Sequence, residues 1–238
     1  MRTYWWKWLA VILLLYSVIG GFLLPVPAKP ILNESIRNLY FHVPMWFGMI
    51  ALFIASFIYS IRYLRADSNQ SLKGGLNADT LTNKKDLADI AAVEYANAGI
   101  LFGILGMATG MLWARYTWGE WWSGDVKQNA SAILLLMYFA YAVLRGSIAD
   151  NKQKAKVSAV YNIFAAACIV PLLFVLPRMT ASLHPGNGGN PGFNAYDLDS
   201  QMRLVFYPAV LAWILAGFWL ANQRIGLKRL ELKLTENV

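Results

Sequence analysis

Six apolar runs, separated by shorter polar segments, follow one another along the chain. A helix of about 20 apolar residues crosses the ~30 Å hydrocarbon core of a bilayer, and each run approaches that length. The pattern therefore predicts an all-α, polytopic membrane protein in which residues 1–238 form a single membrane domain with six transmembrane helices. The predicted spans are residues 5–24, 44–64, 90–112, 130–146, 157–176 and 202–223.

The first run has a competing interpretation as a secretory signal peptide, because Val26-Pro27-Ala28 weakly resembles a cleavage site. The apolar core of a signal peptide is only about 7–15 residues long, and this run is longer. We therefore predict an uncleaved helix. Both interpretations leave residue 30 on the outer side, so the topology of the later spans is unchanged.

Polar and proline-containing segments predict further local structure. Residues 65–89, which include Gly74-Gly75, have the composition of an exposed, flexible loop. Residues 224–238 place leucines near helical spacing among basic residues, which predicts an amphipathic helix on the inner membrane surface. Pro171 predicts a kink in the fifth span.

Four glycines share one face of the third span, because they are spaced four, three and four residues apart. This spacing favours close packing against a neighbouring helix. The alternative is a smooth groove that leaves room for a bulky ligand. The glycines are Gly99, Gly103, Gly106 and Gly110.

Composition agrees with a membrane protein and argues against a nucleic-acid partner. Hydrophobic residues make up 58% of the chain and charged residues 14%, whereas about a quarter of an ordinary soluble domain is charged. The net charge of +8 falls in short clusters between apolar runs, which is typical of membrane orientation. The one cysteine, Cys168, excludes an intrachain disulfide and a Cys-x-x-Cys-His haem attachment site.

The distribution of basic residues predicts that both termini are cytoplasmic. With the N-terminus inside, 15 of the 21 lysines and arginines fall on the inner side, as the positive-inside rule requires. His42, the tryptophan-rich loop at 113–129 and the loop at 177–201, with His184, then lie on the outer face. The six outer basic residues are Lys29, Arg37, Arg115, Lys127, Arg178 and Arg203.

The tryptophan-rich loop combines four indoles with several charges. Charges and irregular backbone are costly in hydrocarbon, so we expect the loop at the membrane–water boundary. Indole rings there suit a large, flat, amphipathic ligand, although an interfacial aromatic belt is the alternative. Asp125 is expected to cap the fourth helix, or to orient a ring.

The only two histidines, His42 and His184, lie at the outer ends of spans and flank this loop. One histidine near a helix end is usually structural, but two imidazoles can serve as axial ligands of haem iron. The hypothesis is therefore a haem b held without a covalent bond, with outer cations near its propionates. Binding of those cations to lipid phosphates is the alternative.

Three motifs together resemble the CcmC-type haem-handling proteins of cytochrome c maturation, which are related to the larger CcsA-type synthetase subunits. The resemblance covers nearly the whole chain, including the number of spans and the order of the motifs. The motifs are Tyr40-Phe41-His42-Val43-Pro44, Trp118-Gly119-Glu120-Trp121-Trp122-Ser123-Gly124-Asp125 and Leu183-His184-Pro185-Gly186.

The resemblance implies a role for each matched residue. It implies that His42 and His184 are axial ligands of the haem iron and that the loop binds haem and presents it to a periplasmic chaperone. Gly124 departs from the family pattern, which usually has a tryptophan there. The loop residues that carry this role are Trp118, Gly119, Trp121, Trp122 and Asp125, with Arg37 and Lys127 as the accompanying basic residues.

The expected function is haem delivery on the outer face of the bacterial cytoplasmic (inner) membrane, without catalysis by the chain itself. The resemblance implies ABC-type transporter subunits and a small one-span subunit as partners, besides the chaperone and membrane lipid. Three alternatives stay open. They are a CcsA-like haem channel or synthetase component, an electron-transfer membrane cytochrome, and a scaffold that binds no haem.

Overall fold

A computed structural model describes residues 4–28, 31–70, 78–184 and 198–236. All regular structure in these ranges is helical, which confirms the predicted fold class. Within these ranges, six helices are long and apolar enough to cross a membrane. The elements are α1 (Trp5–Leu23), the 3₁₀ helix η1 (Asn33–Asn38), α2 (Leu39–Gln70), α3 (Ala78–Trp118), α4 (Val126–Ser147), α5 (Asn151–Ala167), the π-helix η2 (Val170–Val175), α6 (Leu176–Met179) and α7 (Ser200–Glu236).

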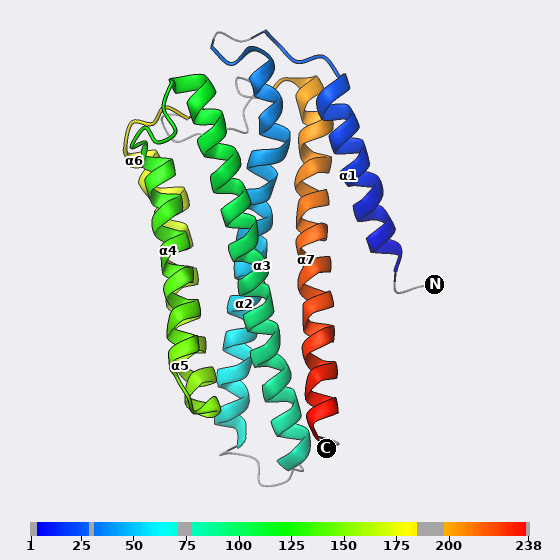
Figure 1. The fold of residues 1–238 in the computed structure, drawn as a ribbon, viewed down its shortest axis with the longest axis vertical. Coiled ribbons are helices and arrows are strands. Elements are labelled where there is room, and N and C mark those ends of the chain that lie inside the picture. The colour runs from blue at the N-terminus through cyan, green and yellow to red at the C-terminus, as the bar shows by residue number, and fades with distance from the viewer. Residues whose placement is uncertain (1–3, 29–30, 71–77, 185–197, 237–238) are drawn as a thin grey trace.

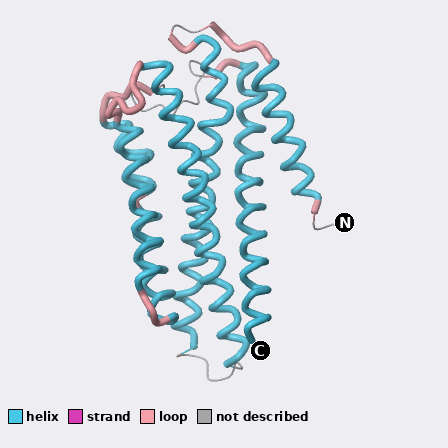
Figure 2. The backbone as a smooth tube through the Cα atoms, viewed as in Figure 1, coloured by secondary structure: helices cyan, strands magenta, loops and turns pink. Residues whose placement is uncertain are grey.

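The long helices lie side by side along the long axis of the molecule (Figure 1). α2 is the central helix and packs against α3, α5 and α7, while α1 packs on the outside of α7. The start of α1 and the end of α7 lie towards the same end of the bundle. The opposite end carries η1, α6 and the turn between α3 and α4, as the tube in Figure 2 shows.

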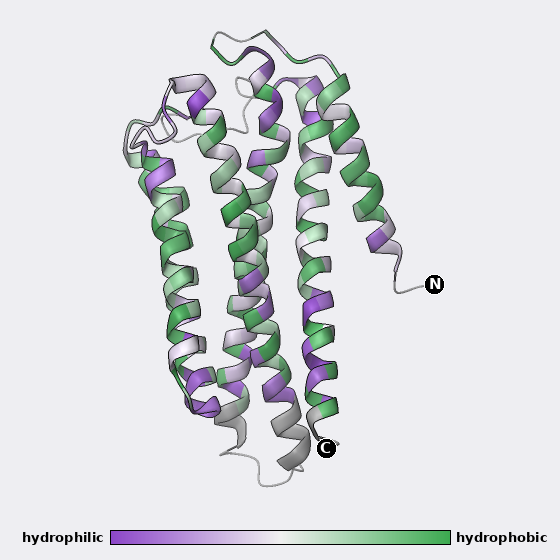
Figure 3. Cartoon of the chain, in the orientation of Figure 1, coloured by the Kyte–Doolittle hydropathy of each residue, from purple (hydrophilic) through white to green (hydrophobic). Residues whose placement is uncertain are grey.

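Apolar residues cover the middle of the bundle, and polar residues gather towards its two ends (Figure 3). Large apolar side chains are exposed along the spans, for example Leu15, Ile19 and Phe22 of α1. Such surfaces are stable in lipid, and helices satisfy their backbone hydrogen bonds internally, as hydrocarbon requires. The fold is that of a multi-pass membrane protein.

The prediction of a loop at 65–89 is wrong for most of its length. α2 continues to Gln70 and α3 begins at Ala78, while Gly74-Gly75 lies outside the described residues. Alanine, leucine and lysine have high helix propensity, and this preference also acts in an exposed, polar segment. The N-terminal part of α3 is also held by α4, because Arg145 of α4 pairs with Asp89 of α3 through two nitrogen–oxygen contacts of 2.9 and 2.5 Å.

The predicted surface helix at the C-terminus is also wrong, because α7 continues through that segment to Glu236 without a break. Ile225 is buried, and Arg224 forms an ion pair with the buried Glu94 of α3. These contacts hold the basic segment in line with the span. At 1.5 Å per residue, a helix of 37 residues is about 55 Å long and must extend beyond the hydrocarbon.

The predicted distortion at Pro171 is confirmed. α5 ends at Ala167, and Pro171 lies in the π-helix η2. Proline has no N–H to donate to the preceding turn, so the hydrogen-bond ladder must be rearranged around it.

The glycines of α3 receive side chains from neighbouring helices, which confirms close packing. A Cβ at Gly99 would lie 2.4 Å from Phe53, and one at Gly103 would lie 2.3 Å from Leu135. Towards the outer end of the bundle, Gly106 and Gly110 receive Trp46 and His42 in the same way (2.9 and 2.5 Å). The glycine face therefore sets the position of His42.

Gly99→Ala is expected to destabilise the protein by about 1–3 kcal/mol, because overpacking forces side chains off their rotamers. Phe53 cannot move aside easily, since its ring stacks on Tyr138 with centroids 3.4 Å apart. Thermal unfolding in detergent measures the effect. Gly226→Ala in α7 is the matched control, because no described residue of another helix comes within 4 Å of its Cβ position. Equal melting temperatures for the two variants would contradict the packing argument.

Candidate functional site

His42 lies in the first turns of α2 and is buried, with 8% of its surface exposed. The imidazole contacts Trp46 and Trp113 edge to face, with centroids 6.1 and 5.9 Å away. Its Nδ1 lies 3.1 Å from the hydroxyl oxygen of Thr109, and the indole N–H of Trp46 donates to its Nε2 over 3.3 Å. Both ring nitrogens are therefore engaged.

The start of this span differs from the prediction. We expected the helix to begin near Pro44, but η1 leads directly into α2, which begins at Leu39. Pro44 is thus inside the helix, in its second turn, where its missing N–H leaves the carbonyl of Tyr40 without the usual i→i−4 donor. His42 still lies at the end of the bundle that carries the tryptophan-rich segment.

His184 is held by Asp125, which lies far away in sequence. The imidazole Nδ1 is 2.7 Å from Oδ1 of Asp125, and the backbone N–H of Leu183 donates to Oδ2 over 2.6 Å. The ring also meets Trp118 edge to face, with centroids 4.8 Å apart. The carboxylate therefore joins the segment after α6 to the segment before α4. The motif residues Pro185 and Gly186 lie outside the described residues.

Asp125 performs both of the roles considered for it. Its Oδ1 accepts the backbone N–H of Lys127 over 2.9 Å and so caps α4. Burial raises the pKa of this carboxyl, but hydrogen bonds from His184 and from the N–H groups of Leu183 and Lys127 outweigh burial and hold the pKa well below its usual range. An ionised carboxylate only accepts hydrogen bonds, so Nδ1 of His184 carries a proton; in the neutral imidazole the lone pair is then on Nε2.

The tryptophan-rich turn is shorter than predicted, because α3 continues to Trp118 and α4 begins at Val126. Gly119 and Gly124 make the turn at φ +82° and +71°, in the left-handed region that favours glycine. Gln128 and Asn129, which lie near the N-terminus of α4, form hydrogen bonds with the tryptophan-rich turn through their side chains. Their contacts are Ser123 N and Oγ to Gln128 Oε1, Asn129 Nδ2 to the Gly124 carbonyl, and Trp122 Nε1 to Asn129 Oδ1.

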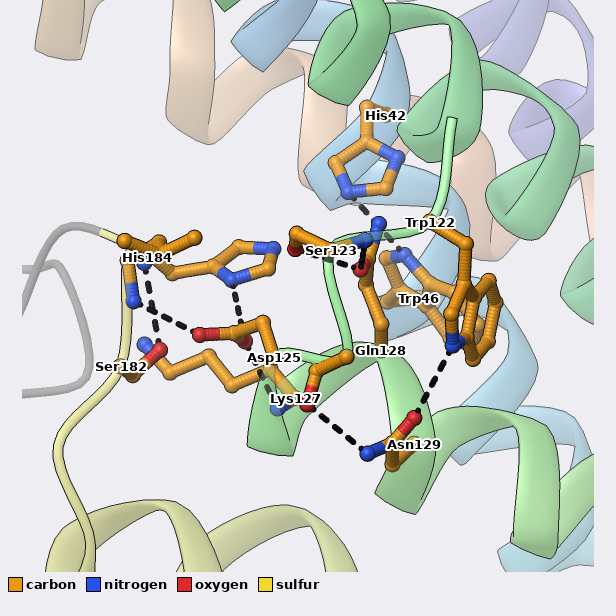
Figure 4. Close-up of polar contacts among 12 residues, drawn as sticks. His42, Trp46, Trp122, Ser123, Asp125, Lys127, Gln128, Asn129, Ser182 and His184 are labelled. Carbon is orange, nitrogen blue, oxygen red and sulfur yellow. Dashed lines mark hydrogen bonds and ion pairs between the residues drawn. The ribbon is translucent and has the colours of Figure 1, made fainter. Parts of the chain in front are cut away.

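A cavity of about 400 Å³ lies at this end of the bundle and is lined by both histidines. Figure 4 shows the two rings approaching from different sides, His42 from α2 and His184 from the segment after α6. Most of the lining is apolar, and Lys127 adds a cation. The volume is in the range of cofactor and ligand sites. Other lining residues include Trp46, Phe47, Met107, Met111, Phe174 and Phe206.

Three of the predicted site residues, Trp121, Trp122 and Arg37, lie outside the lining of the cavity. Trp121 and Trp122 are 52% and 39% exposed on the turn, and so present indole to the outside. Arg37 does not line the cavity. Its guanidinium donates to the carbonyls of Gly21 and Leu24 over 2.9 and 2.7 Å, at the C-terminal end of α1, and its role near a propionate stays a prediction.

Trp46 and Thr109 were missed by the sequence analysis. Trp46 follows His42 by four residues, so helical spacing alone places both on one face of α2. Thr109 carries no such signal, because its contact with His42 depends on how α3 packs against α2.

The donor set suits haem better than a bare metal ion. Among the described residues, no three His, Cys, Asp or Glu side chains gather into a metal-binding group. A bare zinc ion needs three or four protein ligands, whereas haem iron takes only axial ligands from the protein. Two imidazoles in an apolar cavity fit the second case.

Fold and site together define a class: a six-span helical membrane protein with a two-histidine cavity at one end of the bundle. The family model described as heme exporter protein C (CcmC) matches residues 1–237. The chain belongs to this family.

Curated relatives agree with this assignment. The chain is 28% identical to heme exporter protein C of Bradyrhizobium diazoefficiens over 154 residues, which are 65% of this chain and 59% of that protein. It is 23% identical to heme exporter protein C of Escherichia coli K12 over 236 residues, or 94% and 81% of the two chains. A shorter match, 32% over 83 residues, is to cytochrome c biogenesis protein CcsA of Prochlorococcus marinus, covering 35% of this chain and 26% of that protein.

Asp125→Asn is expected to loosen the segment that carries His184. An amide has one acceptor oxygen in place of two and no charge, so it leaves buried donors unsatisfied at a cost of about 1–3 kcal/mol. Hydrogen exchange at residues 180–184 should become at least several-fold faster. Glu120→Gln is the matched control, since the Glu120 side chain is exposed on the same turn. Unchanged exchange in Asp125→Asn would show that the carboxylate does not hold this segment.

Proposed function

We propose that this chain binds one haem b non-covalently between His42 and His184 and delivers it to a periplasmic haem chaperone for cytochrome c assembly. The observation that carries the proposal is that the only two histidines of the chain line one cavity. Membership of the heme exporter protein C family supports a haem-related role in cytochrome c maturation.

The residues around the cavity fit an iron porphyrin. His42 and His184 would hold the iron through Nε2, because in each ring the partner of Nδ1 leaves the lone pair on the other nitrogen. The apolar lining from α2, α3 and η2 suits the macrocycle and excludes water. When bound, haem supplies the vinyl groups through which a cytochrome is later linked; the chain itself positions the group and performs no catalysis.

Lys127 is the cation best placed for a propionate, since it lines the cavity. A lysine ammonium can pair with a carboxylate at the polar edge of an otherwise apolar site. The orientation that follows places the polar edge of the porphyrin towards α4 and leaves the apolar part among the helices. Arg37 would join it only by giving up its ion pair with Glu34 and its hydrogen bonds to the carbonyls of Gly21 and Leu24.

Delivery requires an exposed rim next to the cavity. Trp121 and Trp122 provide one, because the left-handed glycines hold their indoles outwards on the turn. Exposed aromatic residues are common anchors in protein interfaces. We propose that this rim contacts the chaperone.

The proposed location is the bacterial cytoplasmic membrane, with the cavity on the periplasmic side. The turn between α4 and α5 lies at the end of the bundle opposite to the turn between α3 and α4 (Figure 1). Arg145, Lys152 and Lys156 flank it in the sequence, as the positive-inside rule favours for a cytoplasmic end. An ABC-type transporter and a small one-span subunit are the further partners that we propose.

His42→Ala and His184→Ala are each expected to abolish the low-spin, bis-imidazole absorption spectrum of protein purified in detergent and supplied with haem. The physical reason is that each variant removes one axial ligand while the other remains. Added imidazole should restore the spectrum in both variants, which separates loss of a ligand from misfolding. A wild-type protein that stays colourless would favour the scaffold interpretation, and rapid haem reduction by quinol would favour an electron carrier.

Trp121→Ala is expected to reduce formation of a complex with the periplasmic chaperone about tenfold or more, while haem affinity changes little. The indole is exposed on the rim and accounts for interface area that alanine lacks. Co-purification with the chaperone measures the effect. Trp8→Ala is the control, because Trp8 is even more exposed (69%) but lies in the first turn of α1, away from the tryptophan-rich turn. Equal capture of the chaperone by both variants would place the interface elsewhere.

A further inference from the structure

Two side chains outside the recognised motifs hold the imidazole of His42 by its two nitrogens. Thr109 Oγ1 is 3.1 Å from Nδ1, and Trp46 Nε1 is 3.3 Å from Nε2. Gly110 and Gly106 leave the space for the two rings, since a Cβ at Gly110 would lie 2.5 Å from His42 Cε1 and one at Gly106 would lie 2.9 Å from Trp46. The arrangement is therefore part of the packing between α2 and α3.

These contacts define one tautomer of His42. An indole N–H is only a donor, so Nε2 must be the accepting nitrogen and Nδ1 must carry the proton. The geometry of Thr109 agrees independently. Its hydroxyl lies 2.9 Å from the carbonyl of Leu105 and 3.1 Å from that of Gly106, so its proton has an acceptor in the preceding turn and its lone pairs remain for Nδ1–H.

We infer that Thr109 and Trp46 are positioning residues for the His42 ligand: Thr109 holds Nδ1–H, and the Trp46 indole covers Nε2 until a ligand takes its place. This inference rests on the proposed function. The hydrogen bond of Thr109 keeps the lone pair on the nitrogen that faces the cavity. The N–H of Trp46 occupies that lone pair in the free protein and must move before iron can bind.

The arrangement makes the two histidines unequal. His184 gives its Nδ1–H to an ionised carboxylate, whereas His42 gives its own to a neutral hydroxyl. A carboxylate partner raises the basicity of a ligating imidazole more than a hydroxyl does. His42, with the weaker partner and with an indole competing for Nε2, is therefore the ligand that dissociates more readily when haem leaves.

The first test reads the tautomer in the free protein and does not depend on haem. The full-length chain is labelled with ¹⁵N-histidine in detergent, and His184→Gln assigns the two sets of ring signals. Wild-type protein and Thr109→Ser should show His42 protonated at Nδ1 only. The double variant Thr109→Val/Trp46→Phe, which removes the hydroxyl acceptor and the indole donor but keeps both shapes, should show a mixture of tautomers. The His184 signals serve as the internal control for folding.

A wild-type His42 that is protonated at Nε2, or a Thr109→Val/Trp46→Phe spectrum identical to that of wild type, would overturn the inference. Either result can be obtained even if the protein binds no haem, so failure of the inference and failure of the proposed function are distinguishable.

The second test titrates haem into wild-type protein and the single variants. Thr109→Val should bind haem about 10–100-fold more weakly, as expected for loss of a group that orients a metal ligand, and Thr109→Ser should restore affinity to within a few-fold of wild type. Trp46→Phe, which keeps the ring but removes the N–H, should accelerate haem association. Wild-type affinity in Thr109→Val, or slower association in Trp46→Phe, would count against the assigned roles.

Discussion

The site depends on one buried carboxylate. Asp125 accepts hydrogen bonds from the start of α4 and from two groups of the segment after α6. Two spans separate these segments in the sequence. A carboxylate near hydrocarbon is costly unless several donors satisfy it. Its need for donors is therefore what brings His184 beside the tryptophan-rich turn, and the position of the cavity follows from that contact.

The second requirement is the glycine face of α3, which determines where His42 lies. Gly99 and Gly103 admit Phe53 and Leu135 near the middle of the bundle, and Gly106 and Gly110 admit Trp46 and His42 near its outer end. All four glycines thus serve close packing, as the spacing favoured. Gly106 and Gly110 also line the cavity, so the outer part of this face forms part of the cavity wall.

Much of the fold could be predicted, because hydrocarbon allows few structures and an apolar run of this length that crosses it forms a helix. The candidate site could be predicted for a different reason, since the chain has only two histidines and its indoles cluster between them. The helix ends could not be predicted in the same way. Residues 65–70, 78–89 and 224–236 are polar, yet packing contacts such as Arg145–Asp89 and Arg224–Glu94 keep them helical. Thr109 was missed for a related reason, since its role exists only through contact between two helices.

Gly124 shows how a departure from a family pattern acquires a structural role. At φ +71° a tryptophan would be strained by about 1–2 kcal/mol, so an aromatic side chain at this position would require a different turn. The glycine instead lets the chain turn so that Asp125, the next residue, points inwards to His184 and caps α4. Because Trp121 and Trp122 already occupy the exposed side of the turn, the absence of an indole at Gly124 leaves an aromatic rim, while the carboxylate that positions His184 is retained.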